Sequence, residues 1–361
     1  MLLSQATTAL RRAPCVRRPT SGLLTLALLL AVGTIGCTSA LYGRTGAVIT
    51  GYAHDHMVPH LMADDDVGMA CQMGAALTGF VASFERVGAD PDLAAVVSFI
   101  GAGMCAEEAA REAELRQARA IRAGNATEAQ DAAFVASRAH FDAARRFLRA
   151  FQRAEKRFGA FGGACPEIAA DEEVVALLAL SAGIMAVLHD RGARGAAAVP
   201  MTIPPVVARA TTCLDDGRWW GVPSALRAAV WMTVPGSGPA AKEGQNPLAP
   251  ARDALEAASK RGDEAGVRLA RALQVVALTG AGDDAGARVA IAAHAAALQA
   301  KAAPGQWRLL DSYATLLSRH EADRIWSRER GHRGPGVGIG ELPVAPEAPN
   351  PEDESVLDGI D

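Results

Sequence analysis

The chain has 361 residues, of which half are apolar, yet only 5% are aromatic and 78 are alanine. Alanine is the strongest helix former and aromatic residues favour strands, so this composition argues against a β-sandwich or a β-barrel. Lys and Arg number 36 against 40 Asp and Glu, a net charge of −4. This balance excludes a protein that binds nucleic acid through bulk electrostatics, which needs a markedly basic chain.

The first 36 residues have the features of a bacterial export signal. Four arginines, at positions 11, 12, 17 and 18, precede residues 23–35, which carry no charge and are too few to span a bilayer. The run ends in Thr34-Ile35-Gly36-Cys37, which resembles a lipobox except that Thr34 stands where an aliphatic residue is usual. We predict a lipoprotein signal peptide over residues 1–36 and diacylation of Cys37. A plain secretory signal that leaves Cys37 unmodified is the alternative.

The charge of the mature chain supports attachment through lipid. Removing residues 1–36 takes away four of the 36 basic residues and none of the 40 acidic ones, which leaves a net charge of −8. An acidic protein is not attracted to anionic lipid, so two acyl chains are expected to supply the anchor. Thr38, and not Asp, follows Cys37. We therefore expect a lipid-anchored protein on the periplasmic face of the envelope, on the outer membrane in preference to the inner one.

Four regions are expected along the chain. Residues 1–36 are the signal, and residues 37–63, which hold three glycines and lack helical periodicity, are expected to form a flexible tether. Residues 64–330 are expected to form one α-helical domain. Residues 331–361 are rich in Pro, Gly and acidic residues and are expected to be a disordered tail.

Within residues 64–330, turn signals separate about ten helical segments. The expected helices cover residues 64–86, 92–122, 127–158, 171–189, 204–215, 222–234, 250–260, 263–278, 283–301 and 306–328. Such helices joined by short turns favour an all-α array of antiparallel helix pairs. The lengths suit tetratricopeptide-like (TPR-like) repeats, but no clean 34-residue repeat is present, so the repeats must be degenerate.

The sequence holds little that points to catalysis. It has no phosphate-binding loop, no nucleophile elbow and no zinc-protease motif, so we expect neither an enzyme nor a cofactor. His54, His56 and His60 have a spacing that could hold Zn²⁺, but a polar tether explains them better, and no metal site is predicted. His140 lies among arginines and is expected on a solvated helix face. Trp219, Trp220 and Trp231 are candidates for a ligand or partner path, with structural anchoring of a helix turn as the alternative.

Four cysteines remain in the mature body after Cys37. Cys71 and Cys105 fall on small-residue faces of two successive helices, nearly level about the turn between them. Cysteines in an exported protein tend to pair, so the candidate disulfides are Cys71–Cys105 and Cys165–Cys213. The alternative is four buried thiols that act as small apolar side chains.

The order of these features resembles the T-component (TatT) family of TPR-associated TRAP transporters. The matching pieces are Cys37, Gly88-Ala89-Asp90-Pro91, residues 134–147, residues 174–184, the segment from Ile203-Pro204-Pro205 to Leu214-Asp215-Asp216, and the segment from Asn246-Pro247 to Ala257-Ala258. The chain departs from the family in two places. Aromatic residues expected around 178–182 are absent, and the 200–245 stretch is compressed.

The resemblance implies a helical bundle with cryptic TPR-like repeats. It also implies a periplasmic helper of a TRAP-type substrate-binding protein, and no catalytic residues. The leading expectation is thus a membrane-anchored helical scaffold, accessory to a TRAP uptake system, with a periplasmic substrate-binding protein as partner. A general cell-envelope TPR-like interaction lipoprotein is the main alternative, and a periplasmic hydrolase or metal enzyme is a third. No nucleic-acid partner is expected, and the sequence leaves a homo-oligomer open.

Overall fold

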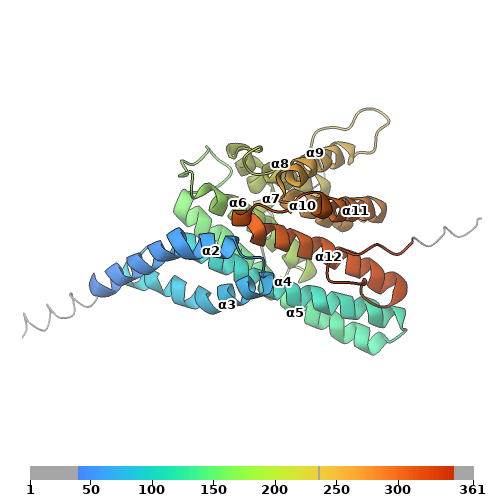
Figure 1. Cartoon of the computed structure of the whole chain (residues 1–361), viewed down its shortest axis with the longest axis horizontal. Helices are drawn as coiled ribbons and strands as arrows, with labels where there is room; N and C mark the ends of the chain where they lie inside the picture. Colours follow the sequence, from blue (N-terminus) through green and yellow to red (C-terminus); the bar gives the residue numbers. More distant parts are fainter. Residues whose placement is uncertain (1–39, 235, 345–361) are drawn as a thin grey trace, which may run out of the picture.

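A computed structural model describes residues 40–234 and 236–344. Within them every regular element is helical, and helix pairs pack side by side (Figure 1), which confirms the predicted all-α architecture. The predicted signal peptide and Cys37 lie outside the described residues, as do residues 345–361 of the predicted tail.

The N-terminal half is built from long helices that pack in sequence order. Residues 40–52 are α-helical and run through a π-helical turn, η1, into α2, so one continuous helix covers residues 40–62. The bounds are η1 (Ala53–Met57), α2 (Val58–Met62), α3 (Val67–Ser83), η2 (Phe84–Val87), α4 (Asp92–Arg122), α5 (Ala126–Phe158) and α6 (Glu173–Gly192). α4 packs against α3 and α5, and α5 packs against α6.

The prediction of a flexible tether over residues 37–63 is therefore wrong for residues 40–62. The glycines that suggested flexibility serve close packing instead. A Cβ atom at Gly43 would lie 2.7 Å from the Val87 carbonyl oxygen, and one at Gly46 would lie 2.9 Å from Phe84. Only glycine at these two positions lets the helix approach residues 84 and 87 so closely. The contact face therefore carries glycines in place of large apolar residues, and the sequence does not show the pattern of an amphipathic helix.

The C-terminal half stacks shorter helices in two rows. α8, α10 and α12 follow one another in one row, and α9 and α11 pack behind them, as in TPR-like arrays. The bounds are α7 (Ile203–Ala210), η3 (Thr211–Cys213), α8 (Val222–Thr233), α9 (Ala249–Ala265), α10 (Leu269–Gly280), α11 (Asp284–Ala300), η4 (Gly305–Trp307) and α12 (Arg308–Arg330). α12 also packs on α4, so the front row of the array faces the N-terminal half.

Local sequence sets most helix starts. Asp66 accepts a hydrogen bond from the Met69 amide at 2.8 Å, Asn125 from the Glu128 amide at 3.1 Å, and Asp283 from the Gly286 amide at 3.0 Å. These side chains cap α3, α5 and α11 by satisfying amides that have no partner within the helix. Proline opens α7, α8 and α9, where its missing amide hydrogen costs nothing.

Two disulfides cross-link the structure. Cys71 on α3 is joined to Cys105 on α4 with their Cα atoms 5.1 Å apart, and Cys165 is joined to Cys213 with their Cα atoms 5.5 Å apart. These are the two pairs that the sequence analysis named. The first ties α3 to the long helix behind it, and the second ties the loop after α5 to the end of α7 and η3.

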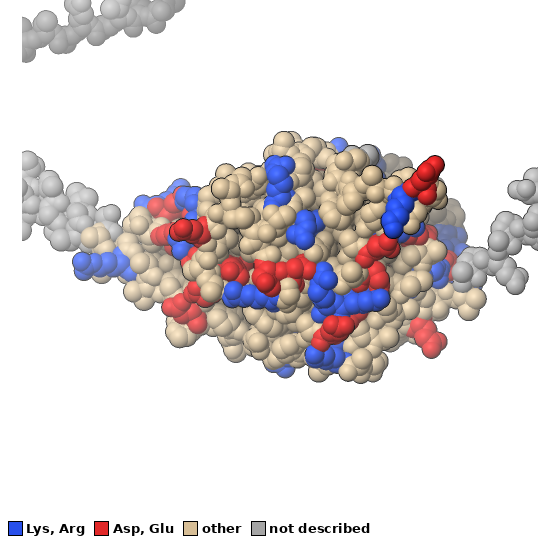
Figure 2. All heavy atoms as spheres, turned by 90° about the horizontal axis from the view of Figure 1, so that it is seen from above, with Lys and Arg blue, Asp and Glu red and all other residues tan. Residues whose placement is uncertain are grey.

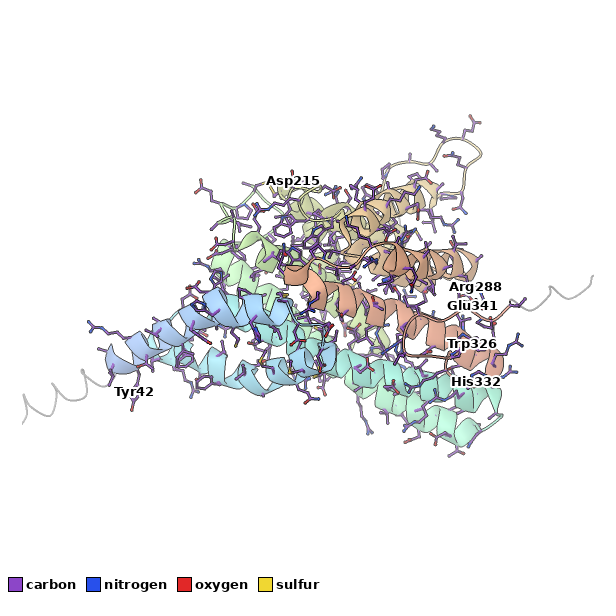
Figure 3. All side chains as sticks on the ribbon, in the orientation of Figure 1. Tyr42, Asp215, Arg288, Trp326, His332 and Glu341 are labelled. Carbon is purple, nitrogen blue, oxygen red and sulfur yellow. A yellow bond between two sulfur atoms is a disulfide. The ribbon has the colours of Figure 1, made fainter. Side chains whose placement is uncertain are left out.

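The predicted disordered tail also needs correction over its first part. Residues 331–344 fold back along α12: the Trp326 indole donates to the Glu341 carbonyl at 3.0 Å, and Arg319 donates to the Val337 carbonyl at 2.9 Å. Ile339 and Leu342 pack against the apolar core. Proline and glycine therefore shape an ordered, irregular strap here, and Trp326 and Glu341 mark its position in Figure 3.

Candidate ligand cavity

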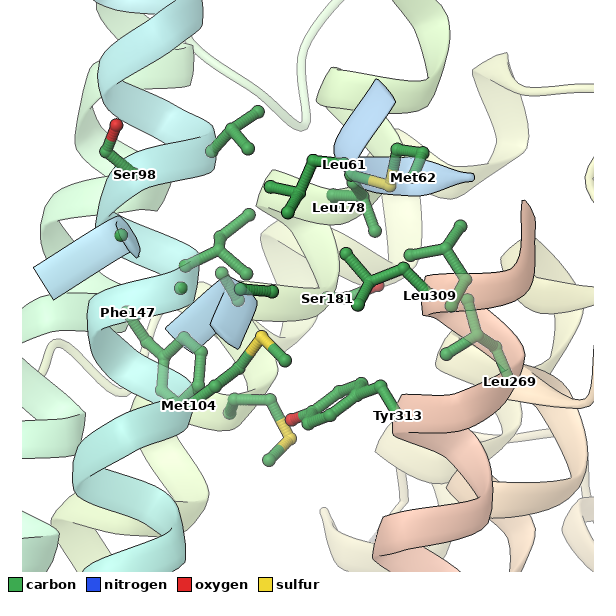
Figure 4. A pocket seen from close by; sticks show the side chains of 18 of the residues that line it. Leu61, Met62, Ser98, Met104, Phe147, Leu178, Ser181, Leu269, Leu309 and Tyr313 are labelled. Atoms are coloured by element: carbon green, nitrogen blue, oxygen red, sulfur yellow. The ribbon is translucent and has the colours of Figure 1, made fainter. Parts of the chain in front are cut away.

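An apolar cavity lies where the two halves of the molecule meet (Figure 4). Its walls come from η1, α2, α3, α4, α5 and α6 on one side and from α8, α10 and α12 on the other. The lining residues are Met57, Leu61, Met62, Ala70, Met73, Gly74, Leu77, Val97, Ser98, Ile100, Gly101, Met104, Phe147, Leu178, Ser181, Ala182, Met185, Val222, Leu269, Leu273, Leu309, Leu310, Tyr313 and Leu317. The empty space between their atoms, including the solvent at its open mouth, is about 1040 Å³.

Three lining side chains carry a hydroxyl, and each donates it elsewhere. Ser98 donates to the Ala94 carbonyl at 2.8 Å, and Ser181 donates to the Leu177 carbonyl at 3.0 Å, both within their own helices. Tyr313 donates to Glu107 Oε2 at 2.5 Å. The cavity therefore presents apolar atoms almost throughout, and a cavity of this kind stays dry and takes apolar ligands.

Methionine is concentrated around this space. Five of the nine methionines in the chain line it, namely Met57, Met62, Met73, Met104 and Met185. The thioether side chain is unbranched and polarizable, so it fills irregular gaps and adapts to different apolar shapes. The lining is thus suited to a flexible aliphatic or amphipathic ligand more than to a rigid polar one.

Behind Tyr313, a buried cluster of charges joins α4 to α12. Arg111 donates to Glu107 Oε1 at 2.6 Å and to Glu321 Oε1 at 3.3 Å. Burial disfavours the charged form of Glu107, but the charge of Arg111, the nearby His189 and the hydrogen bond from Tyr313 outweigh it and hold the pKa of Glu107 well below its ordinary value. Burial, together with the charge of Glu107, raises the pKa of Tyr313 well above 10. The cluster fixes the Tyr313 ring as one wall of the cavity.

Two histidines extend this cluster toward the surface. His189 Nε2 lies 3.5 Å from Glu107 Oε1, His189 Nδ1 lies 2.8 Å from His140 Nδ1, and His140 Nε2 lies 2.9 Å from Glu114 Oε1. The expectation of a solvated position for His140 is wrong, since its side chain is buried under Gly192. Burial lowers the pKa of His189, against the raising effect of Glu107. A row of hydrogen-bonding groups thus links α4, α5, α6 and α12.

The three tryptophans of the predicted ligand or partner path lie elsewhere. Trp219 and Trp220 are buried and meet Trp307 edge to face, with ring centroids 6.2 and 5.1 Å from the Trp307 ring. Trp231 is half-buried on the core, next to Gly238. None of them lines the cavity. Trp219 and Trp220 lie just before α8 and Trp307 just before α12, so these rings pack at the starts of those two helices, and a partner path along the tryptophans stays a prediction.

The histidines of the N-terminal segment do not gather around a common point. His54 Nδ1 lies 2.8 Å from Asp55 Oδ1, while His56 and His60 are exposed. Within residues 40–234 and 236–344, no group of three or more His, Cys, Asp or Glu side chains could hold a metal ion. Figure 2 shows acidic and basic side chains interleaved over one face, so that face does not carry a charge of one sign.

Comparison with known proteins gives no family for this chain. No family model matches it, and neither a curated protein nor a solved structure matches it with significant similarity. The class defined by its own geometry is an all-α array of helix pairs that encloses an apolar cavity.

Proposed function

We propose that this protein is a membrane-anchored periplasmic scaffold that holds an apolar ligand in the cavity and hands it to, or receives it from, a TRAP-type substrate-binding protein. The observation that carries the ligand-binding part is the cavity between α4 and the front row of the helix array. The export signal and the lipobox-like Cys37 support the location, and the resemblance to the T-component family supports the partner.

Binding without chemical change is the better account of this site. A nucleophile needs a neighbouring base and both must face the substrate. The Ser98 and Ser181 hydroxyls are held by carbonyls of their own helices, and the Tyr313 hydroxyl points out of the cavity to Glu107. The described lining therefore offers contact area and shape, which serve recognition, and it presents no pair of reacting groups.

The ligand-binding part is tested by filling the cavity from α6. Ser181→Phe puts an aromatic ring into the space, whereas Ser181→Ala removes only the hydroxyl at the same position. With N-phenyl-1-naphthylamine as the fluorescent apolar probe, we expect Ser181→Phe to weaken binding at least about tenfold, equivalent to about 1.4 kcal/mol, and Ser181→Ala to change it little. Equal binding by both variants at unchanged melting temperature would contradict the cavity as the site.

The location and the partner are tested in cells. Cys37→Ala should release protein into the soluble periplasmic fraction, and a native protein whose mass shows no acyl groups on Cys37 would disprove the acyl anchor. A tag after Asp361 allows capture from detergent-solubilised envelope with the native chain. Recovery of a TRAP substrate-binding protein in stoichiometric amount is the expected result. Recovery of outer-membrane assembly factors instead would favour the general envelope scaffold.

A further inference from the structure

One apolar helix of this protein faces outward. Three described segments, Val67–Val87, Asp92–Arg122 and Glu173–Gly192, are long and apolar enough to cross a membrane. In the second and third, 72% of the most apolar window is buried inside the protein, as a core helix requires. In the first, which contains α3, only 17% is buried. Burial in the protein therefore accounts for the composition of α4 and α6 and leaves that of α3 unexplained.

Exposed apolar side chains gather on α3 and on the helix of residues 40–62, which we call the N-terminal pair. Six of the thirteen large exposed apolar side chains of the described chain lie on it: Leu41, Tyr42, Val48, Tyr52, Met69 and Phe80. No charged residue occurs from position 67 to position 84, and Arg44 is the one charged residue among residues 40–53. An apolar concentration of this kind marks an interaction surface.

The outer end of the pair lies next to the predicted anchor. Gly43 packs against the carbonyl of Val87, so residue 40 and the end of α3 lie at the same end of the pair. Tyr42 marks this end in Figure 3. Cys37 precedes residue 40 by three residues, a reach of at most about 10 Å. A bilayer that holds acyl chains on Cys37 is therefore within contact distance of this end.

Four charged side chains at the outer end are paired with one another. Arg153 donates to Glu85 and to Asp92 at 2.8 Å each, and Lys156 donates to Glu85 at 2.6 Å. Contact with lipid therefore strands none of these four charges, and the exposed Arg44 and Arg86 have long side chains that can reach the headgroups. Tyr42 and Tyr52, each about 60% exposed, have the apolar body and polar tip that suit the boundary between headgroups and acyl chains.

We propose that the N-terminal pair docks on the membrane, with its exposed apolar side chains in the headgroup–acyl boundary of the bilayer that carries the anchor. The occupant of this surface is lipid. The inference rests on the proposed acyl anchor at Cys37, which brings the outer end to the membrane. Docking adds a second contact to the acyl chains and orients the helix array relative to the bilayer.

The test uses single cysteines introduced into the full chain, purified with its own anchor and reconstituted in phosphatidylethanolamine–phosphatidylglycerol vesicles. Val48→Cys and Phe80→Cys report on the pair. Val289→Cys on α11 is the matched control, because Val289 and Val48 are both 71% exposed. Each cysteine is given a nitroxide label, and its collisions with oxygen, which concentrates in lipid, are compared with those of a water-soluble nickel chelate.

We expect the ratio of oxygen to nickel collisions to be several-fold higher at positions 48 and 80 than at position 289. Vesicle-bound protein whose labels at 48 and 80 match that at 289 would overturn the docking while leaving the anchor intact. Labels shielded from both reagents would show a protein occupant, such as a second copy, and would also overturn it. Protein that fails to stay on the vesicles would refute the anchor and, with it, this inference.

Discussion

The two halves of the molecule differ in which contacts stand out between their own helices. In the N-terminal half, glycines let helices approach closely: a Cβ atom at Gly74 would lie 2.7 Å from Gly101 Cα, and one at Gly103 would lie 2.7 Å from the Phe147 ring. In the C-terminal half, buried guanidinium groups join the helices. Arg268 has no exposed side-chain surface, donates to Asp311 at 2.6 Å and to the Ala297 carbonyl at 2.7 Å, and also contacts the Lys301 carbonyl.

The difference follows from helix length. α4 and α5 have 31 and 33 residues, so a continuous seam of small side chains gives them contact over many turns. α10 has only 12 residues and must be fixed to its neighbours at few points. Arg271 does this as well, since it donates to Glu256 at 2.6 Å and to Asp263 at 2.5 Å. Four predictions sharpen this comparison, from the largest effect to the smallest.

Removing the central guanidinium of the helix array should have the largest effect. In Arg268→Met, buried Asp311 loses its charged partner and keeps only the hydrogen bond from the amide of residue 268, and three carbonyls lose a donor. We expect a loss of about 3–5 kcal/mol in the free energy of unfolding, measured with denaturant. Arg328→Met, which breaks a surface pair with Asp284, is the control and should cost at most about 1 kcal/mol. Equal costs would show that buried guanidinium groups do not hold this half.

Removing the disulfide of the N-terminal half should come next. Cys71 and Cys105 are 34 residues apart, and opening a loop of that length costs about 3–4 kcal/mol in the chain-entropy description. In the Cys71→Ala/Cys105→Ala double variant, α3 amides should exchange hydrogen faster while those of α8–α12 keep their protection. The matched variant is Cys165→Ala/Cys213→Ala, which should leave α3 protected. An equal loss of protection in both halves would contradict the view that each half is stabilised by its own contacts.

A single added methyl group should disturb the close contact between Gly74 on α3 and Gly101 on α4. Gly74→Ala pushes its Cβ into the backbone of α4 at Gly101, and we expect a loss of about 1–3 kcal/mol. Gly79→Ala on the same helix has no atom within 4 Å and should instead stabilise the protein by about 0.5–1 kcal/mol, because alanine favours a helix. The two variants differ only in position, so melting temperatures that shift in the same direction would contradict a close contact between α3 and α4 at Gly74.

The smallest effect concerns pH and belongs to the C-terminal half. Burial, together with the charges of Arg268 and Arg271, lowers the pKa of His294 to about 3. Because the folded pKa lies below the unfolded value near 6.5, the stability from neutral His294 is complete above pH 6.5 and is lost as pH falls toward 3. At pH 6 the loss is about 0.8 kcal/mol. His294→Gln should flatten stability between pH 7 and 6, whereas His60→Gln, at an exposed site, should not.

Much of the fold could be predicted from local signals. Gly124-Asn125 before it and the loop from Gly159 after it placed the third predicted helix at residues 127–158, and the structure has α5 at Ala126–Phe158. The helix of residues 40–62 was missed because Gly43 and Gly46 have two physical meanings, flexibility and close approach. Only the position of Val87 and Phe84 across the contact distinguishes them. A single sequence does not reveal that position.

The cavity could not be predicted from the sequence. Met62 and Leu309 both line it, although they are far apart in the chain, and each alone reads as an ordinary core residue. The buried cluster of charges behind Tyr313 could not be predicted for the same reason. Glu107 and Arg111 are spaced as a surface pair on an alanine-rich helix, and their partners Tyr313 and Glu321 lie more than 200 residues away. Trp219, Trp220 and Trp231 were singled out because tryptophan is rare in this chain. In the structure Trp219 and Trp220 pack against Trp307.

The covalent bond between Cys71 and Cys105 has a consequence for selectivity. Four residues close in sequence to these cysteines line the cavity, namely Met73, Gly74, Gly101 and Met104. The bond therefore fixes the spacing of α3 and α4 along that wall of the cavity. Because these two helices cannot move apart, the cavity has an upper limit on the size of ligand that it accepts. In a series of fatty acids of increasing length, affinity should rise with each methylene until the space is filled and then fall abruptly, and reduction of the bond should blunt that cutoff.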